Sequence, residues 1–209
     1  MKTIDRDGTM GFKLNKSEIA ALTAYASDDK TRNNLNVVFF DTVDQRVIAT
    51  DGHRLTTCQA MTLTALAACD VPKRSAMVPL ECMIDVGKRL KSKGEEAIFF
   101  FAKDTVTVTV STFMGDAIYK LAEGDFPPVD RVIPKYKHAP SCGVIGFNAL
   151  YMADIALIGK ACEAKKSPII RFELGPDTSS PALMKIASVS RDCEWTIVLM
   201  PVRLDVSIR

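Results

Sequence analysis

The sequence is short of the residues that build metal centres and disulfide frameworks. It has only two histidines, His53 and His138, and its six cysteines form no Cys-x-x-Cys pair. Cysteines scattered in this way are typical of reduced, mostly buried thiols, and two histidines leave little from which to build a transition-metal site. We therefore expect no metal and no other cofactor. The cysteines are Cys58, Cys69, Cys82, Cys142, Cys162 and Cys193.

Long apolar runs are missing as well. The longest, at 97–102 and 144–159, are too short to span a bilayer or are interrupted by Asn148 and Asp154. The opening residues MKTIDRDGTM contain no apolar segment of the signal-peptide type. We expect a cytoplasmic protein without membrane association. The net charge of +2 is too small to indicate a nucleic-acid partner by itself.

The common sequence motifs of enzymes are also absent. The dipeptides at 87–88 and 159–160 match the end of a phosphate-binding loop, but Cys82 and Asp154 stand where such a loop needs its first glycine. No GxSxG, HExxH or Gly-rich dinucleotide turn occurs. We therefore expect a protein that is not an enzyme.

What the sequence does contain is one order of elements, repeated three times. The first segment has a strand at GFKL, a helix opened by a capping box at Asn15 and Glu18, and strands at NVVFFD, RVIAT and LTTCQA. The second has a strand at SAMVP, a helix after Pro79, and strands at AIFFFA, TVTVTVS and DAIYKLA. The third has CGVIGF, a helix capped by Asn148, and strands at IIRFEL, ALMKIAS and EWTIVLM. This order predicts half-units at about 9–60, 75–123 and 141–204.

The spacing of these half-units predicts the fold class. A period of roughly sixty to seventy residues is longer than a solenoid repeat and indicates duplicated half-domains, each a small sheet with one helix across it. We expect an α+β fold with helices on one face of antiparallel sheets. Connectors at 61–75 and 124–140, the second rich in proline and glycine, separate the half-units. The predicted domains are a complete one at 1–134 and a half domain at 135–209.

One short segment, ATDGHRL at 49–55, places a turn dipeptide directly before a histidine, an arginine and a leucine. The β-forming runs on both sides predict that Asp51-Gly52 reverses the chain between two strands. A plain turn, a catalytic turn, a metal site and part of a binding surface are the alternatives. Neither Asp51 nor His53 has an adjacent nucleophile other than threonine hydroxyls, which disfavours the catalytic alternative.

Three segments together resemble one family, the beta sliding clamp of bacterial DNA polymerase III. They are RNNLNVVFFD followed by ATDGHRL, then GDFPPVDRVIP, then IVLMPVRL, and they occur in the family's order. The resemblance covers roughly residues 10–204 and includes half-domain openings at SAMVPLECMIDVGKRL and GVIGFNALYMADIAL. It implies a DNA-clamp-like fold that encircles duplex DNA, with helices lining the hole, and a processivity factor that tethers a polymerase without chemistry of its own.

The resemblance also implies a hydrophobic groove that captures a short peptide from polymerases and other partner proteins. Gly52 would let the peptide backbone come close, apolar side chains would receive its leucine and aromatic anchors, and His53 and Arg54 would frame the rim. A plain core role for Val198 and Met200 is the alternative. The implied groove residues are Leu35, Thr50, Gly52, His53, Arg54, Leu55, Pro134, Val198, Met200, Pro201, Val202 and Arg203.

Basic residues on and after the second and third predicted helices give a positive lining that could face DNA. They would contact phosphates alone, because a clamp must slide. A solvated surface explains the same residues equally well. They are Lys88, Arg89, Lys91, Lys93, Lys160, Lys165 and Lys166.

The chain departs from the family in its size. A usual clamp chain has six half-units, whereas this one has three, matching both halves of the middle domain and the second half of the last. We expect a homo-oligomer, because the third half-unit lacks its counterpart. Two functions stay open: a ring of several chains, four if it needs twelve half-units, acting as a processivity factor; or a clamp-like interaction or regulatory module, from a phage or mobile element, that binds clamp-binding peptides or DNA without encircling it.

Overall fold

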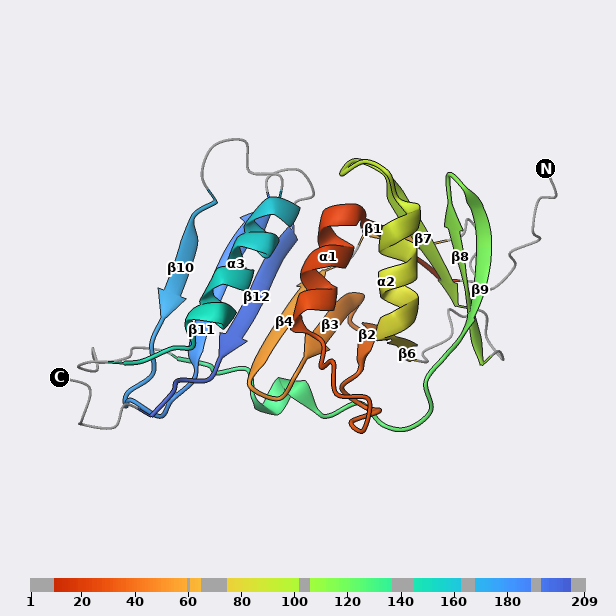
Figure 1. Cartoon of the computed structure of the whole chain (residues 1–209). Coiled ribbons are helices and arrows are strands. Elements are labelled where there is room, and N and C mark those ends of the chain that lie inside the picture. The colour runs from red at the N-terminus through yellow and green to blue at the C-terminus, as the bar shows by residue number, and fades with distance from the viewer. Residues whose placement is uncertain are drawn as a thin grey trace.

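The computed structural model describes residues 10–59, 61–64, 75–101, 106–136, 145–162, 168–188 and 193–203. Three helices lie side by side on one face of antiparallel sheets, in the spatial order α3, α1, α2 (Figure 1). They are α1 (Lys16–Tyr25), α2 (Leu80–Arg89) and α3 (Ala149–Ala161). The predicted α+β class, with helices on one face of antiparallel sheets, is confirmed. None of the described helices is long and apolar enough to cross a membrane.

The order of elements follows the sequence prediction with two differences: one strand is added, and the opening strand expected at CGVIGF is not formed in its described part, which contains only an isolated bridge from Gly146 to Val202. The first part of that predicted strand, 142–144, lies outside the described residues. Around α1 lie β1 (Met10–Asn15), β2 (Val37–Asp41), β3 (Arg46–Thr50) and β4 (Arg54–Gln59). Around α2 lie β6 (Ala76–Pro79), β7 (Glu96–Phe101), β8 (Thr107–Thr112) and β9 (Gly115–Lys120). After α3 come β10 (Ile170–Glu173), β11 (Ala182–Ser188) and β12 (Cys193–Leu199). The added strand is β5 (Met61–Thr64), in a stretch expected to be a connector.

The helix starts follow local sequence signals. In the capping box before α1, the Asn15 side chain accepts from the Glu18 amide at 2.9 Å and the Glu18 carboxylate accepts from the Asn15 amide at 2.7 Å. The Asn148 side chain accepts from the Leu150 amide at 2.9 Å at the start of α3. These bonds satisfy amides that a helix leaves without an internal partner. Both predicted caps are confirmed.

The half-units do not each form a separate sheet, although the sequence predicts one helix on one sheet in each half-unit. The strands form a sheet ordered β5-β1-β7-β8-β9 and another ordered β10-β11-β12-β4-β3-β2-β6. The opening strands of the first two half-units are thus exchanged, since β1 pairs with β7 and β6 pairs with β2. The third half-unit continues the sheet of the first through β12 and β4. Pairing of this kind depends on contacts between distant segments, so no local pattern reveals it.

Two hydrophobic clusters hold the layers together. The larger lies between the helices and the sheets and contains aromatic rings from four strands, with Phe40 at centroid distances of 5.3 Å from Phe12 and 5.0 Å from Phe99. The smaller consists of Ile48, Leu55, Val129, Leu183 and Val198 and joins the other face of the long sheet to the linker after β9. This second cluster positions the candidate site.

The linker after β9 is packed against the sheet rather than merely spanning its surface. It contains the short 3-10 helix η1 (Val129–Arg131), whose Val129 is buried in the smaller cluster. The Arg46 guanidinium donates to both carboxylate oxygens of Asp130, at 2.6 and 2.8 Å. Upstream, the Phe126 ring stacks on Phe39 with centroids 4.4 Å apart. An apolar contact, a forked ion pair and a ring stack therefore fix the path of the linker.

Candidate peptide groove and helix face

A hollow of about 550 Å³, here called the groove, lies between the β3–β4 turn, the chain after β12 and the linker around η1. Segments far apart in the sequence meet there, because β4 pairs with β12 and Val129 is buried beneath both. Its lining consists of Asn34, Leu35, Thr50, Gly52, His53, Arg54, Leu55, Pro127, Pro128, Val129, Arg131, Val132, Val198 and Met200.

The turn at one wall has a defined hydrogen-bond pattern. The Asp51 carboxylate accepts from the amides of His53, at 2.8 Å, and Arg54, at 3.0 Å. The Thr50 hydroxyl accepts from the Gly52 amide at 3.1 Å and donates to the Arg54 carbonyl at 2.7 Å. Gly52 has a φ of 91°, which side-chain-bearing residues rarely adopt. The predicted reversal at Asp51-Gly52 is confirmed.

The floor of the groove is apolar. Leu55 and Val198 lie opposite each other in the β4–β12 pair and are buried. Met200 lies two residues after Val198, and its amide donates to the His53 carbonyl at 3.0 Å, which ties this segment to the turn. Its side chain is 44% exposed, so the plain core alternative holds for Val198 but not for Met200. The groove thus joins a rigid floor to a flexible, accessible thioether.

Arg54 does not frame the rim as the sequence suggested. Its side chain is only 9% exposed, and it donates to Asp51 at 3.0 Å, to Asp154 at 2.6 Å and to the Ala24 carbonyl at 2.6 Å. Its guanidinium also lies over the rings of Tyr25 and Tyr151, 4.7 and 4.4 Å from their centroids. Arg54 therefore fastens the turn to α1 and α3.

The charges around Arg54 explain how the guanidinium is stabilised away from water. Burial lowers the pKa of Arg54, but the hydrogen bonds and negative charges of Asp154 and Asp51 outweigh it and raise that pKa above its usual range. Burial likewise raises the pKa of the neighbouring Tyr25 phenol. The cluster therefore keeps a charged arginine beside a neutral tyrosine at neutral pH.

Eight of the twelve groove residues implied by the sequence come together in the structure. They are Leu35, Thr50, Gly52, His53, Arg54, Leu55, Val198 and Met200. Pro134 instead lines a separate hollow of about 850 Å³ beside Lys135 and Tyr136. Pro201, Val202 and Arg203 are not among the lining residues, and the Val202 amide donates to the Gly146 carbonyl at 2.8 Å.

The second wall of the groove, which the linker forms, was not predicted from the sequence. Asn34 and five linker residues, Pro127, Pro128, Val129, Arg131 and Val132, complete the groove in place of Pro134. The physical reason is that Val129 is buried and Arg46 holds Asp130, which sets where the linker meets the sheet. A signal was available: two prolines with fixed φ directly before an apolar residue mark a stiff segment with one docking side chain.

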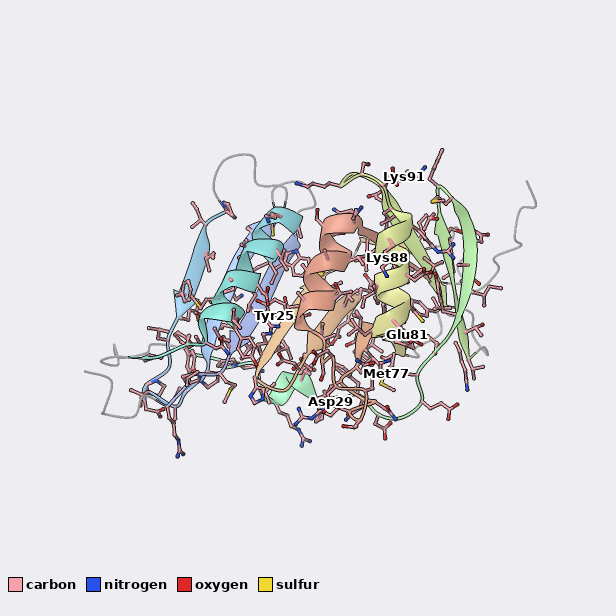
Figure 2. The ribbon with its side chains drawn as sticks, in the orientation of Figure 1. Tyr25, Asp29, Met77, Glu81, Lys88 and Lys91 are labelled. Carbon is pink, nitrogen blue, oxygen red and sulfur yellow. The ribbon has the colours of Figure 1, made fainter. Side chains whose placement is uncertain are left out.

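The candidate DNA-facing residues lie on and after the helices but are not equally free. Lys88 on α2 and Lys91 just after it are exposed on the helix side of the molecule (Figure 2), and Lys93 and Lys160 are exposed too. Arg89 is instead paired with Asp85 at 2.9 Å, and Asp85 also accepts from the Tyr119 hydroxyl at 2.5 Å. Lys165 and Lys166 lie outside the described residues.

Within the part of the chain that the structure describes, no group of three or more histidine, cysteine or acidic side chains could hold a metal ion. The described cysteines Cys58, Cys82 and Cys162 are buried, and burial raises the pKa of the Cys82 thiol to about 11. A buried thiol that stays protonated is a poor nucleophile and a poor metal ligand.

The fold belongs to the DNA-clamp class, as defined by its exchanged opening strands β1 and β6, its single helix layer and its apolar groove beside the β3–β4 turn. The profile of the family described as the DNA polymerase III beta subunit, central domain, matches residues 11–128, more than half of the chain. The chain belongs to this family.

The individual relatives are sliding clamps, and this chain matches only part of the length of each. The beta sliding clamp of Proteus mirabilis is 33% identical over 108 residues, which are 50% of this chain and 27% of that protein. The solved sliding clamps of Pseudomonas aeruginosa and Caulobacter crescentus match 98% of this chain at 20% identity, with TM-scores of 0.66 and 0.68. The matched parts are 69% and 68% of those chains. This chain thus spans about a quarter of the curated relative in sequence.

Proposed function

We propose that this protein is a non-catalytic, clamp-like factor of DNA replication that captures short peptides in the groove and tethers a polymerase or another partner to duplex DNA. The observation that carries the proposal is the groove itself. Residues from the turn, β12 and the linker converge on one apolar hollow beside a glycine with positive φ.

The groove suits a peptide with a leucine and an aromatic or other hydrophobic anchor. Leu55 and Val198 form a buried floor, while Met200 and Val132 stay partly exposed at its edge. Binding energy in such interfaces concentrates on a few apolar anchors in well-packed pockets. Gly52 leaves room for the peptide backbone, because it has no side chain at the wall.

The helix face is the proposed side for DNA. Lys88 and Lys160 on the helices and Lys91 and Lys93 after α2 are exposed, and each would replace counterions at a phosphate. Glu81 and Asp85 lie on the same helix as Lys88, so the face is not uniformly positive. Weak, salt-sensitive contact without base recognition is what a sliding protein needs.

A titration of a fluorescent clamp-binding peptide tests the groove. We expect Met200→Ala to weaken binding by about 1 to 2 kcal/mol, because it removes an anchor contact. Lys88→Ala serves as the matched control and should leave peptide affinity unchanged while lowering affinity for duplex DNA. Equal peptide affinities for the wild type and the Met200 variant, or no binding by either, would contradict the proposed role of the groove.

A non-encircling interaction module is the second candidate. The observation that favours it is that β9 and β10 each stand at the end of a sheet, with no further described strand along the outer edge. Retention on DNA separates the two functions. A ring stays on closed circular DNA and is lost when the circle is cut, whereas a module that binds phosphates from one side is equally retained on both forms.

A further inference from the structure

The strand β10 occupies a position that is filled on both sides in the other half-units. Its counterpart β2 pairs with β3 and with the opening strand β6, and β7 pairs with β8 and with the opening strand β1. β10 pairs with β11, and no other described strand lies along its outer edge. Figure 1 shows β10 at the end of the sheet, beyond α3. An open edge of this kind is a template for another strand.

Large apolar side chains are exposed to solvent at this edge, which is unfavourable for a surface that stays uncovered. Ile169, just before β10, is 84% exposed, and Phe172 within it is 43% exposed. The neighbouring helix α3 carries only two charged residues, Asp154 and Lys160, and its Leu150 is 75% exposed. A helix that is apolar on nearly all sides is usually covered. Ile169 and Phe172 thus leave apolar surface uncovered at the end of the sheet.

The sequence of β10 and the residue after it, Ile-Arg-Phe-Glu-Leu at 170–174, complements itself when paired antiparallel about Phe172. In that register Arg171 faces Glu173 of the second strand, and Glu173 faces Arg171. Phe172 faces its own copy, and Ile170 faces Leu174. Opposite charges and aromatic pairs directly across antiparallel strands are stabilising. The same five residues therefore supply both halves of a matched interface.

We propose that β10 pairs antiparallel with β10 of a second copy of this chain, around a two-fold axis through Phe172. Such an axis, perpendicular to the sheet, keeps both sets of helices on the same face and brings the two α3 helices toward each other. An interface of this type is isologous, because the same patch serves both copies. Within the chain, β4 and β12 already join two half-units in the same antiparallel way, with α1 and α3 packed above them.

Charge reversal, combined with a measurement of stability, tests the proposed interface. Arg171→Glu and Glu173→Arg each place like charges across the proposed interface, whereas the double variant restores opposite charges in reverse order. Arg171 and Glu173 also contact each other within the strand at 3.0 Å, so thermal unfolding of every variant should be recorded. Lys30→Glu, an exposed reversal in the loop after α1, is the control.

We expect sedimentation to give at least twice the 22.9 kDa chain mass for the wild type and the control. Each single reversal should halve that mass, with self-association weakened by at least about tenfold, and the double variant should recover it. A monomer at every concentration for the wild type overturns the proposal, as does a mass that both single reversals leave unchanged or that the double variant fails to recover. This inference goes beyond the proposed function: peptide titration of the same variants reports on the groove, which β10 does not line.

Discussion

At the scale of single residues, Arg54 shows how one side chain can serve a site without lining its rim. Its guanidinium bridges the turn to α1 and α3 through two carboxylates and a carbonyl. Removing it would leave Asp51 and Asp154 without their shared cation. Loss of a partly buried charged partner costs more than loss of a surface ion pair, which contributes little.

We therefore expect Arg54→Ala to lower the free energy of unfolding by about 2 kcal/mol, measured by urea denaturation. Arg54→Lys should recover part of this loss, because a lysine keeps the charge but not the forked donor geometry. Arg32→Ala is the control, since Arg32 also donates to the turn, at the Asp51 carbonyl, from an exposed position. An Arg54 variant no less stable than the Arg32 variant would contradict this assignment.

The residue scale is also where the sequence was most informative about the site. The turn residues and the apolar pair of Leu55 and Val198 were implied by the resemblance to the clamp family, because each lies in a segment that carries that resemblance. Pro134 was misplaced because its position depends on where the linker meets the sheet. That path is decided by Val129 and by the fork from Arg46 to Asp130, contacts between residues distant in the sequence.

At the scale of elements, η1 is the part of the groove that a titratable group controls. The hydrogen bond from Arg46 lowers the pKa of Asp130 below its ordinary value of about 3.9. A carboxylate whose pKa is depressed by folding stabilises the folded linker above that ordinary value, and this contribution disappears as the pH falls through the depressed pKa. The wall of the groove should therefore loosen in acid.

Asp130→Asn tests this clamp. We expect the variant to bind the clamp-type peptide several-fold more weakly at neutral pH, because the linker wall is less firmly held. The ratio of wild-type to variant affinity should be constant above about pH 4 and fall toward one in stronger acid. Asp44→Asn is the control, because Asp44 contacts Arg46 at 3.2 Å but does not hold the linker. A ratio of one at neutral pH would mean that Asp130 does not position the wall.

Local sequence patterns predict some of the helices and strands but not how the strands pair. Caps at Asn15 and Asn148 and the alternating strands were predictable, because each depends on residues near in sequence. The strand β5 and the exchange of β1 and β6 were not, since a strand of four residues forms only through its pairing, here with β1. The helix layer follows from these pairings, and so does the open edge of β10.

At the scale of the whole molecule, pairing through β10 leaves the outer edge of β9 open on each copy. That edge exposes Ile118 at 70%, and the turn before it exposes Phe113 and Met114. If β9 also pairs with β9 of another copy, four chains alternate the two contacts and bring twelve half-units together. A closed ring of four chains requires pairing at both the β9 edge and the β10 edge of every chain. A non-encircling module requires pairing at neither edge.

Ile118→Lys therefore separates the two assemblies. A lysine at the centre of an exposed edge strand disfavours pairing, so the variant should stop at two chains joined through β10, while the wild type reaches four. Native mass spectrometry reads this directly, and retention on closed circular DNA should be lost with the four-chain form. Thr109→Lys, on the neighbouring strand β8, is the control for an added charge away from the edge. Four chains in the Ile118 variant would exclude β9 from closure, and a wild type that stops at two chains would favour the non-encircling module.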